Sequence, residues 1–314
     1  MSSTLKKLAQ YAISAALLVM PAPVFHAAAA DALPTVNTAP RFALVFGNGK
    51  YPTVPLKNAP NDAKAIADQL KRMGFDVTIK LDATRSEMVE TIRAFGSTLQ
   101  KQKGVGLFYF AGHGAQLAWR NYLIPVDAQI KNAAEIDAQA VDMDMLLESM
   151  TRAKNPMNLI ILDACRDNPF GGDVQMQQKG LSQVDAPPGT LLAYATAPGN
   201  TAADGLGANG LYTENVLKEM QAPAAKLEDI FKRVRLNVRL QSKGQQIPWE
   251  STSLEQDFYF RPPKDLKNLS LTETEQQFQD EFAVWEGIQD STEPAPLEDY
   301  LRRYPSGKFS EFAQ

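Results

Sequence analysis

Cysteine and histidine are the scarcest reactive residues of this 314-residue chain. It has one cysteine and two histidines. A single cysteine excludes an intramolecular disulfide framework, and so few soft ligands argue against a zinc site built on cysteine and histidine. Any chemical role of these residues is therefore easy to trace.

An excess of positive charge is also absent. The chain has 32 Lys and Arg against 36 Asp and Glu, a net charge of −4 at pH 7, which argues against nucleic-acid binding as its main function. The hydrophobic share of 44% and the charged share of 22% are typical of a folded globular protein. This length suits one large domain with a small extension, or two domains.

A hydrophobic run of the ~20 residues that a membrane span needs is missing as well. The longest candidate is the apolar run Tyr11–Met20, which follows two lysines and precedes Ala28 and Ala30, an A-x-A cleavage pattern. This arrangement predicts a signal peptide over residues 1–30, secretion across the inner membrane and a periplasmic location. The alternative is an uncleaved membrane anchor, which the short run disfavours.

Removal of residues 1–30 would leave one histidine, His113, and one cysteine, Cys165. The periplasm permits disulfides, but Cys165 has no partner within the chain. The thiol is therefore either a small buried hydrophobic group or a chemically active one.

Strand and helix patterns alternate from residue 41 to residue 260. Thr84 and Glu87 form a capping box before one of the helices, and Gly74 ends another. The alternation predicts an α/β fold with a mostly parallel sheet and helices on both faces. Strands are expected over 41–46, 75–81, 104–110, 157–162, 190–195 and 257–260, and helices over 61–73, 88–99, 141–150, 211–220 and 226–240.

His113 and Cys165 each follow a buried strand closely, in the expected loops after Phe110 and Leu162. Ligands of parallel sheets bind beyond the carboxyl ends of the strands, so both residues belong at one edge. An imidazole that accepts the thiol proton turns a weak nucleophile into a thiolate. Taken singly, each is better interpreted as a core thiol or a loop histidine, but their matched positions favour a Cys–His dyad.

Several motifs accompany the dyad, in which His113 lies 52 positions before Cys165. With them, the chain resembles the caspase-like cysteine peptidases (peptidase family C14), in particular their bacterial branch related to metacaspases and orthocaspases. The resemblance covers about residues 41–260. The motifs are Asn61-Asp62-Ala63, YFAGHG (109–114), NYLIPVD (121–127), DACRDNPF (163–170), AYATAPG (193–199) and QIPW (246–249).

The resemblance implies a three-layer α/β/α caspase-like domain over residues 41–262, with about six strands in its sheet. Cys165 would be the nucleophile and His113 the general base, then the acid for the leaving amine. The backbone N–H groups of Gly114 and Cys165 would form the oxyanion hole. Histidines of this family are commonly oriented by a backbone carbonyl, which the sequence does not identify.

The resemblance also places Asp62 and Asp163 in the substrate pocket, called S1. True caspases cut after aspartate and have a glutamine two places before the cysteine, where this chain has Asp163. Two carboxylates would favour Arg or Lys at the P1 position of a substrate. The alternative is that Asp62 caps a helix and Asp163 forms loop hydrogen bonds.

The chain departs from the family pattern at Ala111, where metacaspases often have a serine. The dyad chemistry requires no cofactor. Calcium activates some relatives through acidic clusters, but no such cluster can be assigned here. The remaining candidates, Asp167, Asp173 and Asp185, are interpreted as solvated loop residues.

The segment 171–189 has the composition of an exposed loop, and Lys179 is its one basic residue. Because relatives are often activated by a cut between the two parts of the domain, we expect self-cleavage at Lys179. The alternative is a substrate-binding loop that is never cut.

Residues 264–314 show two helical stripes, which resemble one unit of a tetratricopeptide-type repeat. Such units bind protein partners and cannot bury their own apolar face alone. The segment is expected either to dock on the domain before it or to be incomplete.

The main hypothesis is an exported cysteine endopeptidase that acts on proteins or peptides with exposed Arg or Lys, without nucleic-acid partners or a membrane span after signal removal. One alternative is a non-enzymatic scaffold that presents its C-terminal helices to a protein partner. The other is a cysteine hydrolase or acyltransferase acting on a non-peptide substrate.

Overall fold

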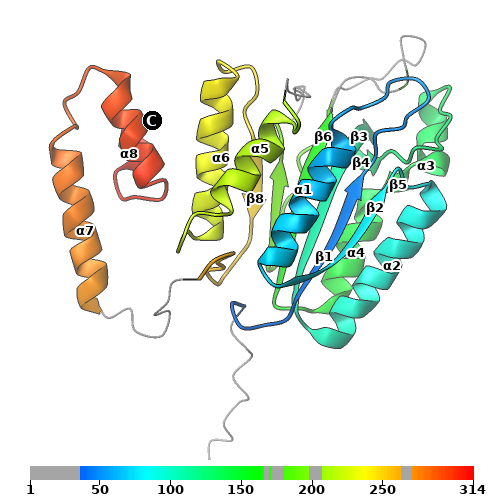
Figure 1. Ribbon diagram of the computed structural model, residues 1–314, viewed down its shortest axis with the longest axis horizontal. Helices are drawn as coiled ribbons and strands as arrows, with labels where there is room; N and C mark the ends of the chain where they lie inside the picture. Colours follow the sequence, from blue (N-terminus) through cyan, green and yellow to red (C-terminus); the bar gives the residue numbers. More distant parts are fainter. Residues whose placement is uncertain (1–35, 166–169, 171–179, 198–206, 263–270) are drawn as a thin grey trace, which may run out of the picture. The chain divides into compact units, whose positions relative to one another are not determined.

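A central β-sheet organises the chain (Figure 1). The computed structural model describes residues 36–165, 170, 180–197, 207–262 and 271–314, with Cys165 described through its backbone. The strand order is β2-β1-β3-β6-β7-β8, in which β8 alone on this path runs antiparallel to its neighbour. The strands are β1 (Arg41–Gly47), β2 (Phe75–Leu81), β3 (Val105–Leu117), β6 (Met157–Cys165), β7 (Thr190–Tyr194) and β8 (Trp249–Thr252).

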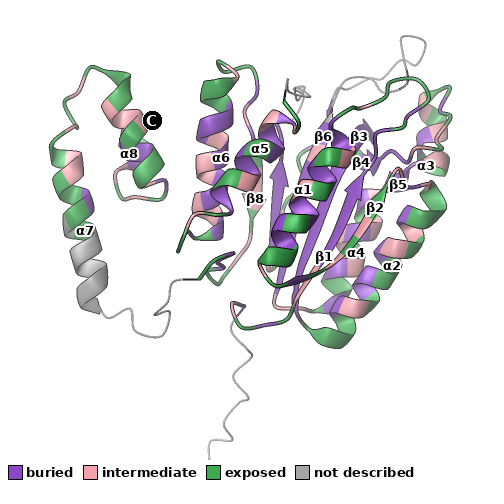
Figure 2. Cartoon of the chain, viewed as in Figure 1, coloured by how far each residue is buried: buried purple, intermediate pink, exposed green. Residues whose placement is uncertain are grey.

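Helices cover both faces of this sheet, because its central strands are apolar on both sides. One buried cluster joins the sheet to α1, α5 and α6, and another joins the opposite face to α2 and α4. Figure 2 shows the central strands as buried and the helices that cover them as buried along one side. The predicted three-layer fold is therefore confirmed. The helices are α1 (Ala59–Arg72), α2 (Arg85–Gln102), α4 (Met143–Ala153), α5 (Leu211–Glu219) and α6 (Leu227–Gln241).

Strand β3 does not end at Phe110, and the expected loop around His113 is absent. Residues beyond Phe110 continue to pair with β6, and from Gly114 onward β3 forms a hairpin with β4 (Arg120–Leu123). Ala118 and Trp119 make the turn with φ of 48° and 67°, a conformation that usually selects Gly or Asn. The expected boundary was wrong because this turn lacks the residues that signal a hairpin. Short elements follow: η1 (Ala133–Glu135), α3 (Ile136–Gln139) and β5 (Val141–Asp142).

The prediction of a last strand over 257–260 is also wrong, because the edge strand is β8. The aromatic residues at alternate positions of 257–260 reflect packing, since Phe258 and Phe260 are buried in the core. The guanidinium of Arg41 donates to the carbonyls of Tyr259 and Phe260, each at 3.2 Å. These contacts hold the segment in place without strand pairing.

The C-terminal segment is helical, as expected: α7 (Leu271–Glu286), α8 (Pro294–Arg303) and α9 (Ser310–Ala313). Tyr300 and Leu301 share a buried cluster with Leu236 of α6. Lys232 of α6 donates to the Ser306 hydroxyl at 2.6 Å. These contacts join the segment to α6. Among the described helices, none has the length and apolar character needed to cross a membrane.

Gly47 permits the close packing of β1 against α1. A Cβ at this position would lie 2.5 Å from the Ala63 Cβ and 2.7 Å from the Ala59 carbonyl oxygen. We expect Gly47→Ala to lower the free energy of unfolding by about 2 kcal/mol, measured by urea denaturation. Gly287→Ala is the control, because its nearest neighbours would be 3.5 Å away. Equal stability of both variants would contradict this packing.

Candidate active site

The register of β3 and β6 brings the two predicted dyad residues together. His113 and Cys165 are Cα partners, and they are the last pair of this ladder. Neighbouring strands lie about 4.8 Å apart, so the two residues stand side by side at the carboxyl edge of the sheet.

The imidazole of His113 is oriented by a backbone carbonyl. Its Nε2 lies 2.6 Å from the carbonyl oxygen of Val54, in the segment between β1 and α1. A carbonyl can only accept, so we assign the proton to Nε2, which leaves Nδ1 as the basic nitrogen of the neutral ring. Val54 therefore supplies the carbonyl that the sequence did not identify.

Tyr51 also holds His113, and the sequence analysis missed it. The Tyr51 hydroxyl accepts the backbone N–H of His113 at 3.0 Å and donates to the carbonyl of Ile124 at 2.9 Å. The two rings lie 4.3 Å apart between centroids. A Cβ at Gly112 would come within 2.7 Å of the Tyr51 hydroxyl, which accounts for a glycine there. Because Tyr51 follows β1, the strand-end rule could have drawn attention to its loop.

The start of this loop is anchored by Asp82. The Asp82 carboxylate accepts the N–H groups of Gly49 and Lys50, each at 2.9 Å, and pairs with the Lys50 ammonium at 3.1 Å. Although partial burial opposes the shift, these contacts hold the pKa of Asp82 below its ordinary value. The segment that leads to Tyr51 and Val54 is therefore fixed where it leaves β1.

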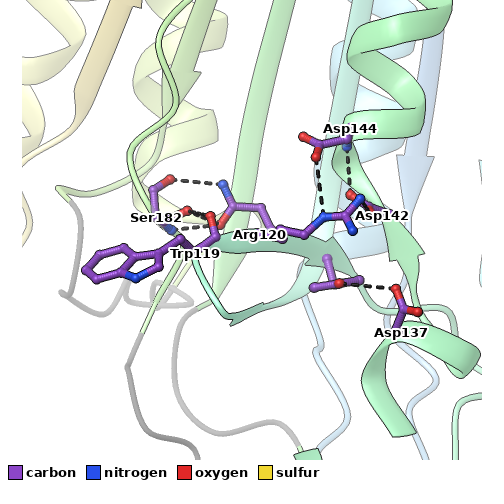
Figure 3. Close-up of polar contacts among 8 residues, drawn as sticks. Trp119, Arg120, Asp137, Asp142, Asp144 and Ser182 are labelled. Atoms are coloured by element: carbon purple, nitrogen blue, oxygen red, sulfur yellow. Dashed lines mark hydrogen bonds and ion pairs between the residues drawn. The ribbon is translucent and has the colours of Figure 1, made fainter. Parts of the chain in front are cut away.

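The β3–β4 hairpin beyond His113 is fixed by polar contacts (Figure 3). Arg120 pairs with Asp142 and, at 3.4 Å, with Asp144. On the other side of the hairpin, the Ser182 hydroxyl donates to the carbonyl of Trp119 at 2.6 Å. These contacts stabilise the extension of the strand that carries His113.

The backbone of Gly114 is directed toward β6. The carbonyl of His113 accepts the N–H of Ile124 at 3.0 Å, on the β4 side of β3. Successive strand residues direct their N–H groups to opposite sides, so the Gly114 N–H faces the strand that ends at Cys165. A Cβ on Gly114 would lie 2.9 Å from Leu181 and 3.1 Å from Ala164. The backbone at Gly114 therefore passes close to both of these residues.

Asp62 and Asp163 are bound by neighbouring residues of the segment 209–213, and the charges of both act on one buried tyrosine. Asp62, in the first turn of α1, is buried and accepts from the Asn209 side chain at 2.8 Å and the Gly210 N–H at 3.0 Å. Asp163 accepts the Thr213 hydroxyl at 2.6 Å. The Asp62 carboxylate therefore does contact the start of a helix, but that helix is α5. Asp163 lies in β6 and not in a loop.

The tyrosine on which both charges act is Tyr109 of β3. Burial raises the pKa of Tyr109 well above its ordinary value, and the charges of Asp163 and Asp62 add to the rise. Burial likewise raises the pKa of Tyr212, again with a contribution from Asp163. Both phenols therefore stay protonated at neutral pH, beside a locally negative site.

Some predicted residues lie outside the described part of the chain: Lys179, Asp167, Asp173 and the signal segment 1–30. Asp185 is described and exposed, and Ala111 is buried within β3. Within the described residues, no group of three or more His, Cys, Asp or Glu side chains is arranged to hold a metal ion.

Comparisons with known proteins identify the family of the chain. The family model of the caspase domain matches residues 40–259. The chain is 30% identical over 179 residues to mucosa-associated lymphoid tissue lymphoma translocation protein 1 of Homo sapiens, and equally to its Mus musculus homolog, over 55% of this chain and 20% of theirs. It is 23% identical over 248 residues to caspase-1 of Mus musculus, over 73% of this chain and 62% of that one. The chain thus spans about a fifth of the length of the first two relatives.

Tyr51→Phe tests the support of His113. The change keeps the ring but removes the acceptor of a buried N–H and a donor to Ile124, so the free energy of unfolding should fall by about 2 kcal/mol. Tyr122→Phe is the control, since it removes one partly buried bond of 3.2 Å to Asp137 and should cost less than about 1 kcal/mol. Urea denaturation measures both, and equal losses would show that Tyr51 has no special role.

Proposed function

Since the chain belongs to the caspase domain family, peptidase family C14, we propose that it is a cysteine endopeptidase with Cys165 as nucleophile and His113 as general base. The observation that carries this proposal is the direct pairing of His113 with Cys165 in the sheet. The bond from His113 to Val54, at 2.6 Å, supports it further, because it leaves Nδ1 as the basic atom.

The proposed reaction runs in two steps. In the first, Nδ1 of His113 takes the thiol proton and Sγ of Cys165 attacks the scissile carbonyl; the imidazolium then protonates the leaving amine as the C–N bond breaks. In the second, His113 takes a proton from water, which attacks the thioester and releases the acid and the thiol. The oxyanion is assigned to the N–H groups of Gly114 and Cys165. The direction of the Gly114 N–H toward β6 supports that assignment.

Cleavage after Arg or Lys is proposed from the charge of the pocket. Asp163 lies two residues before Cys165, and the charges of Asp163 and Asp62 both help to raise the pKa of Tyr109, which supports an acidic pocket beside Cys165. A carboxylate attracts a guanidinium or an ammonium group and repels an aspartate side chain. Substrates would therefore be proteins or peptides with exposed Arg or Lys.

Further parts of the proposal concern location and processing. The N-terminal pattern supports removal of residues 1–30 and a periplasmic location, and Lys179 is proposed as a self-cleavage site. No cofactor is assigned to the reaction, and calcium is an activator to be tested. Exposed aromatic side chains of the C-terminal helices, including Phe282 and Phe312, support contact with a protein partner.

Hydrolysis of reporter peptides that end in Arg, Lys or Asp tests the function. We expect the wild type to release the reporter group after Arg and Lys and not after Asp. Cys165→Ala and His113→Ala should each lower kcat by at least about 1,000-fold. Ser97→Ala, a change on the exposed surface of α2, should retain wild-type rates.

Equal turnover of the Arg and Asp reporters would contradict the proposed specificity. No turnover with or without added calcium would favour the scaffold, and turnover of ester or amide acyl donors alone would favour the non-peptide hydrolase or acyltransferase. Mass spectrometry of the same samples should find a cut after Lys179 in the wild type and none in Cys165→Ala. An intact loop in active wild type would remove the self-cleavage proposal.

A further inference from the structure

Three oxygen atoms from three separate elements form a hydrogen-bonded series next to the proposed pocket. The hydroxyls of Tyr109 in β3 and Thr213 in α5 lie 2.6 Å apart. The Thr213 hydroxyl lies 2.6 Å from the carboxylate of Asp163, at the end of β6. Thr213 and Tyr109 are both fully buried, so water does not compete for the bond between their hydroxyls.

The donor and acceptor of each of these hydrogen bonds follow from the number of protons available. An ionised carboxylate only accepts, so Thr213 must donate its single hydroxyl proton to Asp163. Tyr109 must then donate to Thr213. The raised pKa of Tyr109 keeps that proton on the phenol at neutral pH. The bond to the charged Asp163 is of the stronger, charge-assisted kind, and Tyr109 polarises it further.

The same turn of the chain also holds the second carboxylate. Asn209 and Gly210, just before α5, both donate to Asp62. Residues 209–213 therefore contact both acids, which come from α1 and β6. Positions of the two carboxylates are thus coupled through the start of one helix.

We propose that Thr213 is a positioning residue that fixes the plane of the Asp163 carboxylate and so sets a preference for Arg over Lys at P1. The inference rests on the proposed function and deepens it. A guanidinium is a flat fork that bonds both carboxylate oxygens in one plane, so it depends on the orientation of the acceptor. An ammonium group is a compact charge that tolerates rotation of the carboxylate. Loss of the Thr213 hydroxyl therefore penalises Arg more than Lys.

Thr213→Val keeps the size of the side chain and removes the donor. We expect kcat/KM for the Arg reporter to fall about tenfold, mainly through KM, and kcat/KM for the Lys reporter to fall less than about threefold. Thr213→Ser keeps the hydroxyl and should stay within about twofold of the wild type for both reporters. Thr98→Val, which removes a hydroxyl at the surface of α2, is the matched control and should leave the Arg to Lys ratio unchanged.

A binding measurement separates this proposal from the peptidase proposal. Benzamidine carries a flat amidinium and benzylamine an ammonium, so their Kd values report the pocket without turnover. We expect the wild type to bind benzamidine about tenfold more tightly than benzylamine, and Thr213→Val to bind both alike. If the wild type shows this pattern but cleaves no reporter, the peptidase proposal fails and the positioning role stands.

Other results would overturn the positioning role of Thr213. If the wild type cleaves after Arg but Thr213→Val retains both the Arg to Lys ratio and the benzamidine preference, the positioning role is overturned and the peptidase proposal stands. Failure of the wild type to prefer benzamidine overturns it as well. Should Thr213→Val not fold, Tyr109→Phe tests the same hydrogen-bonded series, because it removes the donor to Thr213 and should lower the Arg to Lys ratio about threefold. An unchanged ratio in that variant would contradict the proposal.

Discussion

The parallel register of β3 and β6 is the constraint on which the proposed chemistry depends. It places His113 opposite Cys165 at the last pair of the ladder, so a shift of one residue would move the imidazole to the other face of the sheet. The apolar side chains before this pair are buried on both sides and fix the register. The pairing of His113 with Cys165 is thus a consequence of core packing.

Around this pair, the site is completed by segments that follow strands or begin helices. The loop after β1 supplies Tyr51 and the Val54 carbonyl to His113. The start of α5 holds the carboxylates of Asp62 and Asp163. One side of the proposed site thus orients the imidazole of His113, and the other side orients two carboxylates. This division fits a reaction in which a proton moves at His113 while a cationic substrate group is held nearby.

Local sequence signals predicted much of the fold, and long-range contacts account for most of the rest. The Thr84–Glu87 capping box and the αL glycine at position 74 are both present, because each depends on neighbouring residues. The extension of β3 past Phe110 depends on pairing with β4 and β6, which local composition does not report. The aromatic alternation at 257–260 looked like a strand because packing against a core imposes the same spacing as pairing.

The candidate site also has a part that local sequence signals predicted and a part that depends on long-range contacts. Strand-end position and residue scarcity led to His113 and Cys165. Tyr51, Val54 and Thr213 act through contacts across 50 or more residues, and a backbone carbonyl carries no sequence signature at all.

The pH dependence of Cys165 alkylation shows whether His113 and Cys165 act as one unit. The chain has a single cysteine, so iodoacetamide reports that thiol alone. If His113 accepts the thiol proton, the wild type should show a midpoint below the ~8.5 of a free thiol, and the rate at pH 7 should fall at least about tenfold in His113→Ala. Identical profiles for the wild type and His113→Ala would contradict the dyad.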